Sequence, residues 1–102
     1  MYFVLFEATP RRDAQAAPGV AGAYVSCWIE RRTLEEAVRV ARSRIEAMGW
    51  IVDNPDNAYR VCASNYGPGK SGREYFEQAL IDKEVLVFHW YPEVDREAAD
   101  EP

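Results

Sequence analysis

Residues 33–49, TLEEAVRVARSRIEAMG, form the stretch that most restricts how this chain can fold. Apolar residues recur there at spacings of three and four, which predicts one buried stripe along an amphipathic helix. Thr33 and Glu36 have the spacing of a capping box, and Gly49 suits the left-handed conformation that often ends a helix. Because a lone helix of this length is unstable in water, the stripe must pack against another element. The predicted stripe is Leu34, Ala37, Val38, Ala41, Ile45 and Met48.

Apolar and β-branched runs on both sides of this helix predict the sheet that covers the stripe. The segment 50–63 is compatible with one bulged strand or with a small hairpin, because residues 54–57, Asn-Pro-Asp-Asn, are typical of a turn. The expected strands are 2–8, 23–30, 50–53, 58–63 and 84–91, and a second helix is expected at 73–83.

The resulting order of elements, β-β-α-β-α-β, predicts an α+β fold. Right-handed crossovers over the helices would place both helices on one face of a mostly antiparallel sheet. We therefore expect a two-layer sandwich, in the broad neighbourhood of ferredoxin-like folds. This expectation comes from the pattern of elements alone.

Negative charge is concentrated at one end of the chain. The 102 residues carry a formal net charge of −5, and the last ten, EVDREAADEP, hold five acids and one arginine. Residues 1–92 are therefore nearly neutral and form one predicted domain, whereas residues 93–102 are expected to be an acidic, flexible tail. Because the domain lacks a basic surface, we expect no nucleic-acid partner.

Apolar runs in this chain are all too short to span a membrane, and the N-terminal MYFVLFEATP lacks the basic start of a signal peptide. We therefore expect a cytoplasmic protein without a membrane partner. Cys27 and Cys62 lie in apolar, strand-like runs and are expected to be reduced, buried thiols. With one histidine and no CxxC motif, local spacing supplies no metal site, and no cofactor is expected.

The loop 64–71, SNYGPGKS, ends like a phosphate-binding P-loop. However, Ser64 stands where that motif requires its first glycine, and Pro68 removes one of the amides that would bind phosphate. A nucleotide site is therefore not expected. The alternatives are a weak anion site at the start of the second helix or a plain Gly/Pro loop.

Aromatic residues in the strands are the most informative candidates for a functional surface. Alternate positions along a strand share a face, so each of three strands carries an aromatic pair on one face. If these pairs align, the sheet face without helices becomes an aromatic surface, which usually marks an interface or a binding groove. His89, the only histidine, is either a packed strand residue or part of a pocket. The candidate ligand or interface residues are Tyr2, Phe6, Tyr24, Trp28, Phe88, His89 and Trp90.

Three interpretations of the aromatic surface are open. Two subunits could pack their sheet faces in a symmetric homodimer, the surface could bind a ligand or a partner protein, or the helices and the 10–22 connection could cover both faces. No catalytic group of residues is recognisable, so we expect a non-enzymatic domain that self-associates or binds another protein. The alternative is a small-molecule-binding domain or an enzyme with a pocket near His89.

Overall fold

The computed structural model describes residues 1–11, 19–67, 69 and 72–92. It is an α+β fold with a five-stranded antiparallel sheet and two helices, as the pattern of the sequence predicts. The predicted acidic tail at 93–102 and much of the 10–22 connection lie outside the described residues. The elements are β1 (Tyr2–Pro10), β2 (Val20–Ile29), α1 (Leu34–Ala47), β3 (Trp50–Val52), β4 (Asn57–Arg60), a 3₁₀ turn (Ala63–Asn65), α2 (Arg73–Asp82) and β5 (Glu84–Pro92).

Strands β1 and β2 form the centre of the sheet. The strand order is β3-β1-β2-β5, and β4 also pairs with β1. β3 lies beside the end of β1, with Trp50 opposite Pro10, whereas β4 lies beside its start, with Arg60 opposite Tyr2. Both run antiparallel to β1, so segment 50–63 is one interrupted edge strand and not a hairpin. Pro55 falls in the interruption, where its missing N–H breaks no ladder bond.

One face of the sheet, which we call the α1 face, packs against the first helix. The strand register places Val4 opposite Cys27 and Cys27 opposite Leu86, so these three side chains share a face. The helix residues buried against this face are Ala37, Ala41 and Ile45. These three residues belong to the predicted stripe, so the helical period identifies the side of α1 that meets the sheet.

The opposite face, which we call the α2 face, packs against the second helix. There Phe3 lies opposite Trp28 and Trp28 opposite Val85, and the buried Phe76 and Ala79 of α2 pack on this group. The prediction that both helices cover one face is therefore wrong. The crossover rule constrains connections between parallel strands, whereas β4 and β5 run antiparallel to each other, so the rule does not fix the side of α2.

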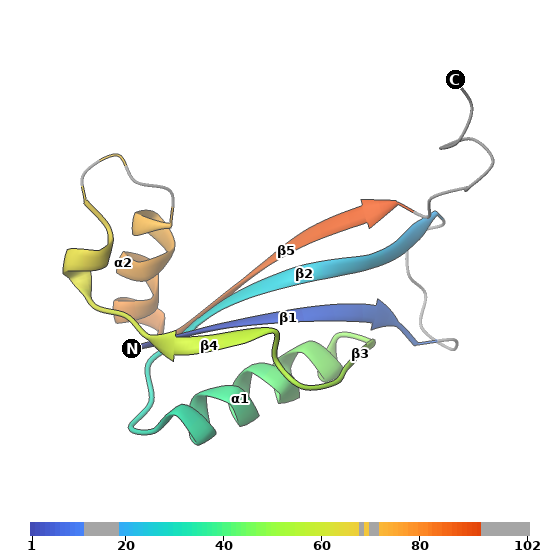
Figure 1. Ribbon diagram of the computed structural model, residues 1–102, viewed down its shortest axis with the longest axis horizontal. Helices are drawn as coiled ribbons and strands as arrows, with labels where there is room; N and C mark the ends of the chain where they lie inside the picture. Colours follow the sequence, from blue (N-terminus) through green and yellow to red (C-terminus); the bar gives the residue numbers. More distant parts are fainter. Residues whose placement is uncertain (12–18, 68, 70–71, 93–102) are drawn as a thin grey trace.

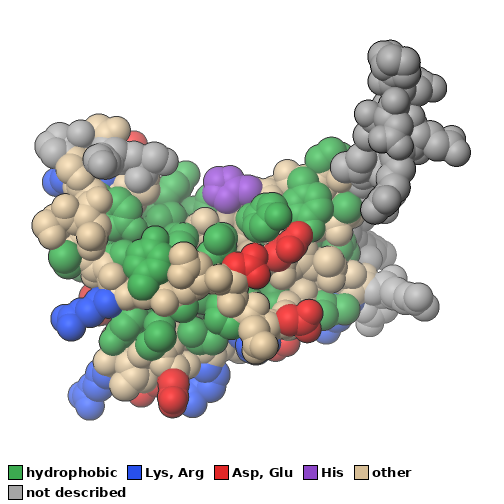
Figure 2. All heavy atoms as spheres, in the orientation of Figure 1, with side chains coloured by type: hydrophobic (Ala, Val, Ile, Leu, Met, Phe, Trp, Pro, Cys, Tyr) green, Lys and Arg blue, Asp and Glu red, His purple; other side chains and the backbone are tan. Residues whose placement is uncertain are grey.

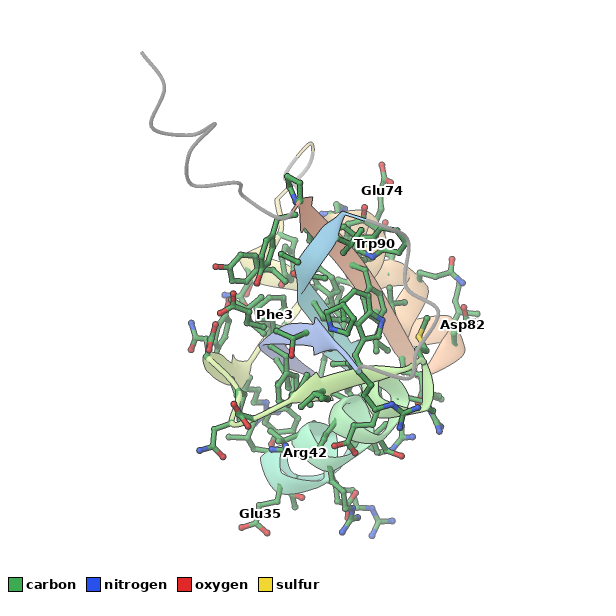
Figure 3. All side chains as sticks on the ribbon, turned by 90° about the vertical axis from the view of Figure 1, so that its right-hand side faces the viewer. Phe3, Glu35, Arg42, Glu74, Asp82 and Trp90 are labelled. Atoms are coloured by element: carbon green, nitrogen blue, oxygen red, sulfur yellow. The ribbon has the colours of Figure 1, made fainter. Side chains whose placement is uncertain are left out.

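The figures show the two helices on different sides of the strands. In Figure 1, α1 lies below the sheet and α2 stands above one end of it. Figure 3 shows Glu35 and Arg42 with α1 below the strands, while Glu74 and Asp82 lie with α2 higher and to the right. The sheet is therefore the middle layer of the fold, not one layer of a two-layer sandwich.

Helix α1 begins as its sequence predicts but covers less of the sheet than its stripe suggests. The Thr33 hydroxyl accepts a hydrogen bond from the Glu36 amide at 3.1 Å. At the two ends of the stripe, Leu34 and Met48 are 38% and 62% exposed. Met48 is the C-cap residue, and its backbone has left the helical conformation. Its side chain therefore no longer follows the buried stripe.

We predict that Ile45→Ala lowers the free energy of unfolding by about 3 kcal/mol, because Ile45 is fully buried between α1 and the sheet. Met48→Ala is the matched control on the exposed end of the same stripe, and we expect a change below about 0.5 kcal/mol. Urea unfolding followed by tryptophan fluorescence measures both values. Equal losses in the two variants would contradict the packing of α1 described above.

Candidate interaction surfaces

The structure divides the seven candidate residues between the two faces of the sheet. The antiparallel register places Phe3, and not Tyr2, opposite Trp28, so the aromatic pairs of β1 and β2 point to opposite sides. The predicted single aromatic surface therefore does not form. Tyr2, Phe6, Phe88 and Trp90 lie on the α1 face, and Tyr24, Trp28 and His89 lie on the α2 face.

Several of these candidates are core residues. Phe6 is fully buried on the α1 face, where the Arg42 guanidinium lies 5.5 Å from the centre of its ring. Tyr2 is half-buried against the same core. On the α2 face, Trp28 is buried and its indole Nε1 donates a hydrogen bond to the Tyr66 hydroxyl at 3.0 Å. These three aromatic residues serve packing and present little surface to a partner.

Beyond the end of α1, aromatic rings from both edge strands cover the α1 face. Trp50 of β3 lies 5.8 Å from Phe88 and 6.3 Å from Trp90 of β5, measured between ring centres. The rings can meet across two central strands because those strands carry the small residues Ala8 and Ala23 there. Trp90 is still 58% exposed, so it is the ring of this group that a partner can reach.

The α2 face is covered along only part of its length. Helix α2 packs over the end that holds Trp28, whereas Tyr24 and His89 further along are exposed. Figure 2 shows the histidine on the upper edge of the molecule, in the dip beside α2, with hydrophobic side chains next to it. The uncovered part of this face is therefore open to solvent, and a ligand can reach it.

A tyrosine that the sequence analysis did not select crosses this uncovered part. Tyr91 of β5 reaches over β2, and its hydroxyl donates a hydrogen bond to Glu7 Oε2 of β1 at 2.6 Å. This bond raises the pKa of Tyr91 to about 12, so the phenol keeps its proton well above neutral pH. The Tyr91 ring centre lies 5.5 Å from that of Tyr24. Tyr91 therefore fixes the position of the Glu7 carboxylate beside two aromatic rings.

Gly22 makes this crossing possible. A Cβ atom added at Gly22 would lie 2.6 Å from Cζ of Tyr91 and 2.7 Å from the carbonyl oxygen of Ala8. Glycine inside a strand often marks such a close approach or a bulge, and the register of β2 with β5 shifts between Val20 and Gly22. That glycine was the signal in the sequence that could have indicated a close approach at this point of β2, although not that Tyr91 makes it.

The two edges of the sheet differ in how they resist pairing with another chain. Natural sheets protect an edge with proline, with charged residues or with interruptions. The edge made of β3 and β4 has all three, because it is broken at residues 53–56, Asp-Asn-Pro-Asp. In contrast, β5 is nine residues long, has no Lys, Arg or Pro before Pro92, and is half-buried and apolar from Val85 to Phe88. Among the described residues, no strand pairs with its outer edge.

The two cysteines occupy different environments, which corrects the expectation that both are buried. Cys27 is buried in the core, and burial raises its pKa to about 12. Cys62 is exposed and lies two residues beyond the end of β4 at Arg60. Its Sγ lies 3.1 Å from Oγ of Ser64, and hydrogen bonding to Ser64 lowers its pKa below the usual thiol value.

A charged depression lies between the start of α1 and the end of α2, at the end of the sheet away from Tyr24 and Tyr91. Two of its charged residues already have partners outside its lining: Glu30 pairs with the N-terminal ammonium at 3.1 Å, and Arg31 pairs with Glu84 at 3.3 Å. The residues that line it are Glu30, Arg31, Arg32, Glu36 and Lys83. Acids and bases mixed in this way select no single charge of ligand.

The loop 64–71, which partly resembles a P-loop, shows no phosphate-binding site in its described residues. Its first part is the 3₁₀ turn at Ala63–Asn65, while Pro68, Lys70 and Ser71 lie outside the described residues. Within the described part of the chain, no three His, Cys, Asp or Glu residues come together as a metal site. The helices seen in that part are all too short or too polar to cross a membrane.

Comparisons of the chain with protein-family models, with curated proteins and with solved structures give no significant match. The functional argument therefore rests on the geometry of this chain. Three features carry it: the outer edge of β5, the exposed Trp90 beside that edge, and the uncovered part of the α2 face with Glu7, Tyr24 and Tyr91.

We predict that Gly22→Ala lowers the free energy of unfolding by about 2 kcal/mol, because the added methyl group meets the Tyr91 ring and a backbone oxygen. The same change in a Tyr91→Ala background should cost less by about 1 kcal/mol, because the ring is then absent. Urea unfolding of the four proteins in this cycle measures the difference. Equal costs in both backgrounds would contradict the position of Tyr91 over Gly22.

We predict that iodoacetamide alkylates Cys62 in the native protein and alkylates Cys27 only after unfolding. Thiolate is the reactive form, and a lowered pKa gives Cys62 a larger thiolate fraction at neutral pH, whereas the buried Cys27 stays protonated. Ser64→Ala should slow the reaction of Cys62 and move its midpoint to higher pH. Peptide mapping by mass spectrometry reports both sites, and equal labelling rates would contradict this assignment.

Proposed function

We propose that this protein is a small self-associating domain whose subunits join through the outer edge of β5. The observation that carries the proposal is the contrast between the protected edge of β3 and β4 and the unprotected edge of β5. A long apolar edge strand presents unpaired N–H and C=O groups that a second strand can satisfy. Pairing there would extend the sheet from one subunit into the next.

A second copy of β5 suits this edge. If two β5 strands pair antiparallel over their full length, the twofold axis falls at Phe88, the middle of the nine residues. Leu86 of one copy then faces Trp90 of the other on the α1 face, and Glu84 faces Pro92. No like charges face each other in this register, so nothing opposes the pairing electrostatically.

Side-chain exposure along the strand supports the same proposal. The residues from Val85 to Phe88 are only half-buried in one chain, and Trp90 is 58% exposed. Strand pairing would cover part of this apolar surface, and such burial contributes about 25 cal/mol for each Å² removed from water. The gain would come from Leu86 and Trp90 on the α1 face, in addition to the backbone hydrogen bonds.

We predict that the wild-type protein sediments and scatters light as a dimer, and that Trp90→Lys makes it a monomer. A lysine on an edge strand disfavours pairing because its ammonium group must stay in water. Since Trp90 is largely exposed, the fold of the single chain should survive, which circular dichroism checks. Sedimentation velocity over a wide range of concentrations is the measurement.

The matched control is Tyr59→Lys on the protected edge. Tyr59 lies on β4, is 45% exposed and also contacts one aromatic ring, that of Phe3 at 5.3 Å. This variant should remain a dimer. A monomeric wild type up to millimolar concentration, or a Trp90→Lys variant as dimeric as the wild type, would refute self-association through β5. A dimer lost in both variants would point to a different interface.

A further inference from the structure

Three residues form a row across the uncovered half of the α2 face. The strand register places Glu7 of β1 opposite Tyr24 of β2, and Tyr24 opposite His89 of β5. Directly opposite residues of antiparallel strands have neighbouring side chains, so the row is continuous. Tyr91 joins it diagonally through its contacts with Tyr24 and Glu7. We call Glu7, Tyr24, His89 and Tyr91 together the Tyr24 site.

The Tyr24 site holds a carboxylate that has no counter-ion among the described residues. The ion pairs among the described residues do not include Glu7. The hydroxyl of Tyr91 occupies Oε2 of Glu7 and holds the carboxylate in place, while Oε1 has no hydrogen-bond partner in the described part of the chain. A negative charge is thus fixed beside aromatic rings, and it is available to a cation from outside.

The rings at this site suit a cation as well. The Tyr24 side chain is 44% exposed, so its ring is open to solvent. A cation within about 6 Å of such a ring centre is attracted by the negative face of the π system. Glu7 and Tyr24 are neighbours, so one small cation can contact both.

We propose that the Tyr24 site binds an organic ammonium group, such as the methylated ammonium of a choline-like small molecule. The hydrogen bond from Tyr91 uses one of the four lone pairs of the Glu7 carboxylate and fixes its position. A methylated ammonium group acts as a charge with an apolar surface, so it needs a fixed negative charge and the face of an aromatic ring. Glu7 supplies the charge and Tyr24 supplies the ring.

This proposal is independent of self-association. The Tyr24 site lies on the α2 face, whereas Trp90 lies on the α1 face. The Trp90→Lys variant should therefore keep its affinity for the ammonium ligand even if it no longer forms a dimer. If the protein does not form a dimer, NMR titration can still test ammonium binding. If it does not bind ammonium, sedimentation velocity can still test dimer formation.

The test is a titration of the full-length protein with choline, followed by NMR of the aromatic side chains. Choline should shift the ring signals of Tyr24 and Tyr91. Its neutral isostere 3,3-dimethylbutan-1-ol should bind at least about threefold more weakly, because it keeps the shape and lacks the charge. Glu7→Gln should weaken choline binding by a similar factor, since it keeps an acceptor for Tyr91 and removes the charge.

Two further variants separate the site from general effects on the sheet. Tyr24→Ala should remove most of the choline binding, whereas Tyr59→Ala should leave it unchanged. Tyr59 is the matched control because it is a tyrosine on the same face, with 45% exposure against 44% for Tyr24, but without a carboxylate beside it. Retained folding of each variant is checked by the dispersion of its NMR signals.

The outcomes that would overturn the proposal are specific. Equal affinity for choline and its neutral isostere would exclude recognition of the charge, and unchanged binding in Tyr24→Ala would exclude this site. Tighter binding of guanidinium than of choline would overturn the choice of a methylated ammonium group as the ligand. A trimethyllysine peptide should bind no more tightly than choline, and an affinity about tenfold higher would overturn a small-molecule ligand in favour of a protein tail.

Discussion

The central strands β1 and β2 are apolar on both faces over much of their length, and the rest of the fold depends on covering both. Val4 and Cys27 point to α1, while Phe3 and Trp28 point to α2. Exposed apolar surface costs about 25 cal/mol per Å², so neither face can stay open along that length. Helices of 14 and 10 residues reach over only part of each face. The half of the sheet that the helices do not reach must therefore be covered by other side chains.

This half is covered in the same way on both faces. A large aromatic ring from an edge strand lies over a small residue of a central strand. On the α1 face, Trp50 reaches across Ala8 and Ala23. On the α2 face, Tyr91 reaches across Gly22. This cover is thinner than a helix and leaves other rings accessible. The surfaces proposed to bind partners are therefore the places where the sheet has no helix above it.

Local signals in the sequence were sufficient to predict helix α1 and the α+β class. The capping pair at Thr33 and the period of the stripe act within a few residues, so they can be recognised without the tertiary structure. The grouping of the aromatic residues could not be predicted, because moving the strand register by one residue turns every side chain to the other face. The position of Tyr91 depends on that register and on its shift between Val20 and Gly22.

Strand β5 links the proposed interface to the proposed ligand site. Its alternate residues supply Trp90 to the α1 face and His89 and Tyr91 to the α2 face, so one strand forms the edge and contributes to both surfaces. A twofold axis at Phe88 in a continuous sheet would keep the α2 faces of both copies on the same side. Glu7, Tyr24, His89 and Tyr91 all belong to one chain, so each copy holds a complete Tyr24 site whether or not it is paired. One strand can therefore serve two surfaces, because its alternate residues point to opposite faces of the sheet.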